Sequence, residues 1–163
     1  EINIQDVVDF VGLHSDATRV YIGTDSERHR ENNTWMADYI SVVVVHIDGK
    51  HGCKIFGCVK RDRDYDQNKS RPAMRMMAEV RKSAELYNKV FDALVSRPEI
   101  AVNMEIHLDI NEMAKHGSSC VVDEAIGYVR GVCGITPQIK PDAFSASYAA
   151  DRYKEIVGMK VAH

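Results

Sequence analysis

The segment MEIHLDINEM, residues 104–113, alternates apolar and polar residue types over most of its length. Successive side chains of a β-strand point to opposite faces of the sheet. The isoleucines and the leucine therefore share one face, and the other face carries His107, Asp109 and Asn111. Carboxylates bind hard cations, and imidazoles carry protons. This polar face belongs either to plain solvent or to a chemical site, and a site requires further acids at matching places.

Two further acids occupy positions from which they can reach the same site. Asp25 ends the predicted strand RVYIGTDS, and Glu79 borders the apolar stripe of a long predicted helix instead of standing on its solvent side. If the strands of Asp25 and Asp109 are neighbours, their carboxylates meet at one edge of the sheet. Carboxylates held close together repel one another unless a cation lies between them, and hard oxygen ligands favour Mg²⁺ or Mn²⁺ over zinc. An ordinary boundary glutamate is the alternative interpretation of Glu79.

The closing predicted helix, residues 141–158, offers two aspartates, Asp142 and Asp151. Each residue turns about 100° around a helix axis, so these two side chains point to opposite sides and only one can serve a given site. Asp142 lies in the first turn, where capping and the helix dipole also account for an acid. Asp151 has its own alternative, because it can pair at the surface with Arg152 or Lys154.

Hydrophobic periodicity predicts the elements that must position these side chains. The predicted helices are 2–12, 71–96, 118–132 and 141–158, and the predicted strands are 19–26, 34–47, 53–61, 101–110 and 136–140. The first three strands form an antiparallel meander through the turn DGKHG, and the core order is βββαβαβα. This order predicts an α/β fold, a mixed five-stranded sheet with helices on its faces.

Composition limits the class of protein and its partners. The 163 residues are 45% apolar and 28% charged, which fits one domain over residues 1–163, with a short helix at 2–12 and a core at 19–157. The formal charge of -3 argues against nonspecific coating of nucleic acid. No apolar run approaches the roughly 20 residues of a membrane helix, and the first residues lack a signal-peptide pattern. We therefore expect a soluble cytoplasmic protein without a membrane partner.

The four cysteines do not predict a metal centre. Cys53 and Cys58 point to opposite faces of a predicted strand, and neither Cys120 nor Cys133 belongs to a CxxC pair. Reduced, mostly buried thiols suit a cytosolic protein.

A basic segment interrupts the acidic chain before the long helix. Residues 60–75, KRDRDYDQNKSRPAMR, contain six basic and three acidic side chains. A solvated loop accounts for this composition by itself. Beside a cluster of acids the same segment suits phosphate anchoring, because a cation-filled site needs contacts to the phosphates around it.

The order βββαβαβα, with acids on the first strand, the first long helix, the fourth strand and the last helix, resembles the ribonuclease H-like nuclease superfamily. Four motifs, IGTDS, AEVRKS, IHLDIN and KPDAFSASYAADR, resemble more closely a family of bacterial and phage proteins known as predicted ribonuclease H-like nucleases. The resemblance covers residues 19–155, nearly the whole predicted core. Each motif is moderately specific, and their shared order makes the set considerably more so.

This resemblance implies a ribonuclease H-like fold in which four carboxylates hold two divalent cations, Mg²⁺ or Mn²⁺. The matching positions are Asp25, Glu79, Asp109 and an aspartate of the closing helix. The superfamily has this last acid at the start of the helix, which favours Asp142, while the closer family's motif contains both Asp142 and Asp151. The implied reaction is hydrolysis of phosphodiester bonds in RNA/DNA hybrids, structured DNA or RNA.

Other polar residues have predicted supporting roles. His107 shares the face of Asp109 and is a candidate proton carrier, although a histidine beside a ligand is commonly structural. Asn111 can hydrogen-bond a phosphate, and His29 is a second proton-carrier candidate. The predicted nucleic-acid contacts are the basic residues around the site: Arg28, Arg30, Lys69, Arg71, Arg75 and Lys140. No aromatic-rich stacking surface accompanies them, which argues against avid single-strand binding.

Two other functions compete with the nuclease. A catalytically silent ribonuclease H-like module uses the fold to bind nucleic acid or a protein partner, since fold alone does not establish chemistry; four acids in register argue against it. A nucleotide-binding fold of the actin and sugar-kinase type also has an aspartate near Gly-Thr. In that superfamily the acid precedes the glycine, and the protein has two domains. In this chain the acid follows the glycine, in GTD, and the length fits a single domain.

Overall fold

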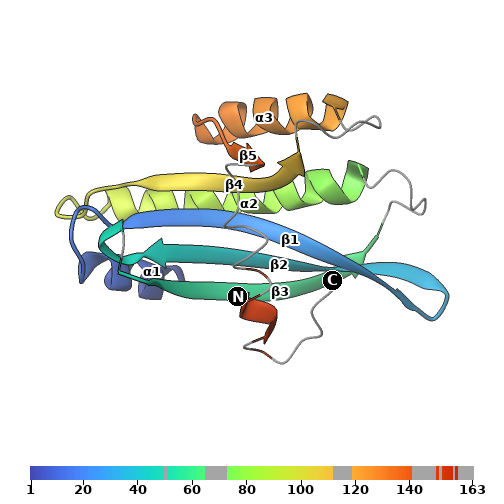
Figure 1. Cartoon of the computed structure of the whole chain (residues 1–163), viewed down its shortest axis with the longest axis horizontal. Helices are drawn as coiled ribbons and strands as arrows, with labels where there is room; N and C mark the ends of the chain where they lie inside the picture. The colour runs from blue at the N-terminus through green and yellow to red at the C-terminus, as the bar shows by residue number, and fades with distance from the viewer. Residues whose placement is uncertain are drawn as a thin grey trace.

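The computed structural model describes residues 1–49, 51–64, 73–111, 119–140, 150, 152–155 and 157. The elements follow the predicted order (Figure 1): α1 (Ile4–Gly12), β1 (Arg19–Glu31), β2 (Thr34–His46), η1 (Ile47–Gly49), β3 (Cys53–Arg63), α2 (Ala73–Val95), β4 (Met104–Asn111), α3 (Ser119–Cys133) and β5 (Gln138–Lys140). In the predicted closing helix, Ala150 and residues 152–155 are helical. The two candidate ligands of that helix, Asp142 and Asp151, lie outside the described residues.

The five strands form one mixed sheet in the order β3-β2-β1-β4-β5. β1 pairs with β2, and β2 with β3, in antiparallel register, whereas β1 with β4 and β4 with β5 are parallel. The parallel pairs follow from the helical crossovers, since each crossover returns the chain to the starting edge of the sheet. The predicted α/β fold with a mixed five-stranded sheet is confirmed.

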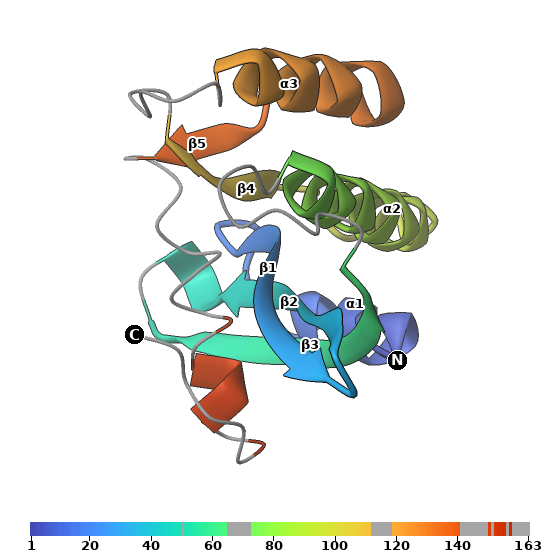
Figure 2. The ribbon, with the colours of Figure 1, turned by 90° about the vertical axis from the view of Figure 1, so that its right-hand side faces the viewer.

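The two faces of the sheet are covered differently. α1 and α2 lie on one face, and the helical residues 152–155 lie on the other (Figure 2). The larger core lies under α2, where Val20, Ile22, Val43 and Ile106 are buried. A smaller cluster on the opposite face joins Ile40, Val42 and Val44 to Ala150. Both faces of the central strands are therefore covered, which explains their long β-branched runs.

α2 packs on the sheet through an apolar stripe. Its buried residues recur at spacings of three or four: Met77, Val80, Ala84, Tyr87, Val90 and Leu94. The exposed side carries charged residues such as Arg81, Glu85 and Lys89. Neither α2 nor any other helix in the described part of the chain has the length and apolar character needed to cross a membrane.

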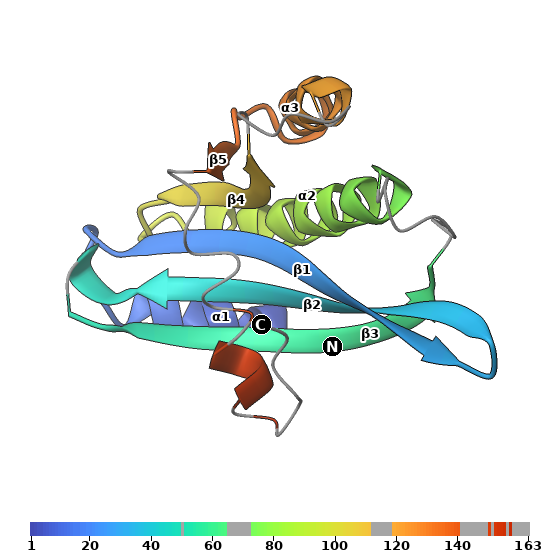
Figure 3. The same cartoon turned by 45° about the vertical axis from the view of Figure 1, so that its right-hand side comes forward.

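β1 is longer than its predicted span of 19–26, because cross-strand pairing with β2 continues to Glu31↔Thr34. The turn-forming types in the TDS sequence predicted an end that the pairing overrides. Asn32 and Asn33 close the hairpin with φ values of 51° and 63°, the left-handed conformation that two-residue hairpin turns require. The resulting β1–β2 arm extends beyond the helices (Figure 3).

Candidate active site

Asp25 and Asp109 lie at the same level of neighbouring strands. The last parallel pair between β1 and β4 is Ile22↔Ile106, and each aspartate lies three residues beyond it. The two strands separate there (Figure 1). Both aspartates share the face opposite α2, since strand residues alternate between faces. The two strands are therefore neighbours, which is the condition under which their acids were expected to meet, and the acids flank the point where the strands part.

Glu79 is held beside Asp25 through Ser26. The Ser26 hydroxyl donates to Glu79 Oε1 at 2.5 Å, and the Ser26 backbone N–H donates to Asp25 Oδ1 at 2.9 Å. Arg75, one turn before Glu79 on α2, donates from Nη1 to the same hydroxyl at 3.4 Å. Sequence reasoning missed Ser26, although a hydroxyl directly after Asp25 was the available signal.

The electrostatic environment of Glu79 links it to both strand aspartates. The pKa of Glu79 is raised from its ordinary value near 4.5 to about 8, mainly by burial and in smaller part by the negative charges of Asp25 and Asp109. The Ser26 hydrogen bond and the Arg75 charge act in the opposite direction. The three predicted acids therefore share one electrostatic field, in which added positive charge would favour the ionised carboxylate.

Three buried hydroxyls fix α2 on the sheet directly beneath this cluster. Ser83 Oγ donates to Thr24 Oγ1 at 2.9 Å, and Thr24 Oγ1 lies 3.1 Å from Ser41 Oγ. Thr24 precedes Asp25 on β1, and Ser83 follows Glu79 by one helical turn. This hydroxyl chain sets the position of α2 on β1 and therefore the position of Glu79 relative to Asp25.

His107 lies on the same face of β4 as Asp109 and has protein partners on two sides. Its Nε2 is 3.0 Å from Glu105 Oε2, and its ring centroid is 4.8 Å from that of Tyr21. The imidazole is buried, with 3% of the residue exposed. Sequence reasoning missed Glu105, which lies two residues before His107 in the same alternation. The proton-carrying role of His107 stays a prediction.

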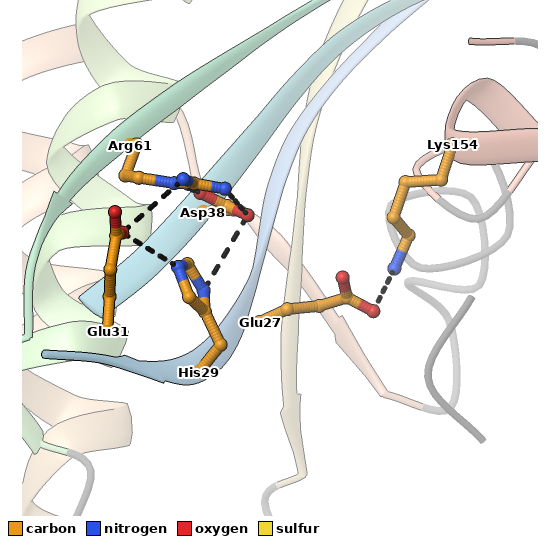
Figure 4. Close-up of polar contacts among 6 residues, drawn as sticks. All are labelled: Glu27, His29, Glu31, Asp38, Arg61 and Lys154. Atoms are coloured by element: carbon orange, nitrogen blue, oxygen red, sulfur yellow. Dashed lines mark hydrogen bonds and ion pairs between the residues drawn. The ribbon is translucent and has the colours of Figure 1, made fainter. Parts of the chain in front are cut away.

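The closing helical segment reaches the Asp25 face through Lys154. Lys154 Nζ lies 3.1 Å from Glu27 Oε1, and only 1% of the lysine is exposed (Figure 4). Glu27 is two residues beyond Asp25, so it shares the same face of β1. Tyr153 packs on Gly57 of β3, where an added Cβ would approach the ring to 2.7 Å. Lys154 is thus an internal partner of β1, not the surface residue that the alternative pairing with Asp151 assumed.

The predicted nucleic-acid contacts on β1 have partners within the protein. Arg28 forms an ion pair with the buried Asp64 and stacks over Trp35, with 4.2 Å between its guanidinium carbon and the ring centroid. Arg30 is exposed and lies 5.3 Å from the same centroid. His29 lies between two acids of the hairpin arm (Figure 4). The binding roles of Arg28 and Arg30 stay predictions.

The remaining predicted contacts are only partly described. Arg75 lies beside Ser26, as above. Lys69 and Arg71 lie outside the described residues, as do the side chains of Lys140 and Asn111, whose backbones belong to β5 and β4.

The candidate ligands are carboxylates, which bind divalent cations. Among the described residues, however, no three acids, histidines or cysteines are grouped closely enough to hold a metal ion. Carboxylate oxygens are the ligands that Mg²⁺ and Mn²⁺ prefer.

Comparison with protein-family models gives a match. A protein-family model described as Ribonuclease H-like matches residues 3–155. No curated protein and no solved structure matches the chain.

Proposed function

The chain belongs to the Ribonuclease H-like family, and from this premise we propose that it is a metal-dependent nuclease that hydrolyses phosphodiester bonds. Membership points to a nuclease-type or nucleic-acid-related function. One observation supports the more specific proposal of a metal-dependent nuclease. Asp25 and Asp109 lie at the same level of β1 and β4, where the two strands separate, and both raise the pKa of Glu79. Its substrate would be an RNA/DNA hybrid, structured DNA or structured RNA.

Asp25, Glu79 and Asp109 would hold two Mg²⁺ or Mn²⁺ ions, together with Asp142 or Asp151 of the closing segment. When bound, such ions supply an activated water and neutralise the charge on the leaving oxygen. The protein would contribute by fixing the acids. Ser26 holds the Glu79 carboxylate at a defined place, and the hydroxyl chain beneath it prevents α2 from sliding along β1.

Arg75 and Ser26 would also set the ionisation of Glu79. Both favour its carboxylate form, against the burial and the neighbouring acids that favour the protonated form. A carboxyl group must be ionised to serve as a metal ligand. His107, with Nε2 against Glu105, can hold a proton on the Asp109 face without leaving its place in the sheet.

Substitution of the two strand acids tests the proposal. Wild type, Asp25→Asn and Asp109→Asn are incubated with hybrid, duplex, branched and single-stranded substrates in Mg²⁺ or Mn²⁺. We expect the wild type to cut at least one substrate and both variants to lose that activity. Asp123→Asn, which changes an exposed acid of α3, is the matched control and should cut normally. If the wild type cuts nothing, a silent module that binds nucleic acid or protein takes the place of the nuclease.

A further inference from the structure

A groove lies between α2 and the β2–β3 part of the sheet, on the flank of α2 away from its apolar stripe. Its volume is about 310 Å³, and its lining includes five basic side chains and two acidic ones. The basic residues are Lys60 and Arg63 of β3 and Arg75, Arg81 and Lys82 of α2. The described lining thus has a surplus of three positive charges in a chain of net charge -3, which is a concentrated attractive field for an anion.

The groove is continuous with the acid cluster through Arg75. This arginine lines the groove and also donates to the Ser26 hydroxyl that binds Glu79. Whatever binds at the Arg75 end of the groove therefore lies next to Ser26 and Glu79. Because those acids repel anions, a separate positive surface is required to hold a polyanion beside them.

The charges of the groove are accessible and their positions are partly fixed. Lys60 and Arg81 are exposed, and within the part of the chain that the structure describes neither has an ion pair. Lys82 lies over the Tyr39 ring, with Nζ 4.9 Å from the centroid. Burial and the nearby acids raise the pKa of Tyr39 to about 12, so its phenol stays protonated and can donate a hydrogen bond.

We propose that this groove binds backbone phosphate of the nucleic-acid strand that is presented to Asp25, Glu79 and Asp109. The proposal rests on the proposed function, because it assumes that the acids act on nucleic acid. Arginine and lysine side chains on two facing walls suit the repeated charges of a phosphodiester backbone. Among the described lining residues, the aromatic side chain is that of Tyr39, which is buried beneath Lys82 and offers no face for base stacking, so the contact should be independent of sequence.

Salt-dependent binding measures these contacts without requiring cleavage. Fluorescence anisotropy follows a labelled RNA/DNA hybrid, a duplex DNA and a single strand over a series of salt concentrations, all in the Asp25→Asn background. Lys60→Gln, Arg81→Gln and Lys82→Gln each remove one groove charge. We expect each to weaken binding several-fold at 0.1 M salt and to reduce the slope of log K against log salt by about 0.9 for duplexes or 0.7 for single strands.

Two variants on the same helix provide matched controls. Lys89→Gln removes an exposed charge of α2 outside the groove and should leave the slope unchanged. Glu85→Gln removes a negative charge that lines the groove and should tighten binding. Circular dichroism confirms that each variant is folded, which these surface positions allow.

The outcomes separate this inference from the proposed function. If the groove variants bind with the wild-type slope, or if their losses equal that of Lys89→Gln, the phosphate groove is wrong even when the wild type cuts nucleic acid. If the slope falls as expected but the wild type cuts nothing, the groove stands and the nuclease does not. Failure of the parent protein to bind any of the three probes overturns the groove as well.

Discussion

Acids in two regions of the sheet have opposite surroundings. On the β1–β2 arm, Glu27 contacts Lys154 and Asp38 contacts Arg61 (Figure 4). At the β1–β4 separation, Glu79 meets the Ser26 hydroxyl, and its pKa is raised first by burial and then by two neighbouring aspartates. An acid that stabilises a fold gains from a cation nearby, whereas grouped acids cost stability. The difference teaches that the grouping of the acids, more than their number, marks the candidate site.

The largest expected effects come from two Asp→Asn substitutions, one in each region, which should affect different properties of the protein. Asp64→Asn removes a fully buried partner of Arg28, whose side chain is 12% exposed, and should lower the free energy of unfolding by about 3–5 kcal/mol. Asp109→Asn removes one of the grouped negative charges that raise the pKa of Glu79, so it should lower that free energy by less than Asp64→Asn does. It should instead reduce cleavage by more than about 100-fold, since even outer partners of metal ligands contribute 10–100-fold.

Urea unfolding and cleavage per folded molecule are measured on both variants. Asp64→Asn should retain cleavage once the folded fraction is taken into account. Loss of stability in Asp109→Asn comparable to that in Asp64→Asn would contradict the comparison, because Asp109 would then be a structural acid like those of the arm.

The Glu27–Lys154 pair offers the next largest effect. Glu27→Gln leaves a buried ammonium group without this carboxylate, and we expect a loss of about 2–3 kcal/mol, less than for Asp64 because Glu27 is 18% exposed. Lys154→Met in the Glu27→Gln background should recover part of that loss. A double-mutant cycle by urea unfolding gives the coupling energy. Coupling below about 0.5 kcal/mol would show that the closing segment is held on β1 by other contacts.

Glu79 should make stability depend on pH in the opposite sense to the ion-paired acids. Its folded pKa of about 8 lies above the ordinary value near 4.5, so the folded state holds the proton more tightly. The resulting stabilisation is complete below pH 4.5 and is lost as pH rises toward 8. Because the side chain is only partly buried, we expect a loss of about 1–2 kcal/mol between pH 5 and pH 8.

Glu79→Gln should remove this pH dependence, as measured by urea unfolding at several pH values. Glu85→Gln, an exposed acid of the same helix, should leave it unchanged. Added Mg²⁺ should restore wild-type stability at pH 8 but have less effect on Glu79→Gln. An equal pH dependence in wild type and Glu79→Gln would mean that Glu79 does not experience the grouped charge.

The sequence predicted the arrangement of elements better than the contacts between them. Periodicity located every described α-helix and strand but not the short 3-10 helix η1, and the motifs resembled the superfamily that the match over residues 3–155 confirms. The strand neighbourhood of Asp25 and Asp109 was a condition of the sequence argument, and the strand order meets it. These features depend on local pattern and chain order, which a sequence displays directly. The metal-binding role of the acids remains a prediction.

Long-range polar contacts were beyond sequence reasoning. Lys154 and Glu27 are 127 positions apart, and nothing in either segment indicates that they meet. Ser26, Ser83 and Thr24 were missed because hydroxyl residues have no periodic signature and commonly face solvent. The length of β1 was wrong because pairing with β2 outweighs the turn preference of Thr, Asp and Ser.

The smallest expected effect concerns the hydroxyl chain of Ser83, Thr24 and Ser41, which lies beneath the acid cluster. Ser83→Ala removes one buried hydrogen bond to Thr24 and should lower the free energy of unfolding by about 1 kcal/mol. Ser96→Ala, which removes an exposed hydroxyl bonded to Ala93 O at the end of the same helix, is the control and should change it by less than about 0.5 kcal/mol. Because Ser83 lies one turn from Glu79, Ser83→Ala should also lower cleavage several-fold while Ser96→Ala does not. An unchanged cleavage rate in Ser83→Ala would show that Ser26 positions Glu79 without help from the hydroxyl chain. The acids of the arm and those of the candidate site would then differ only in the charges around them.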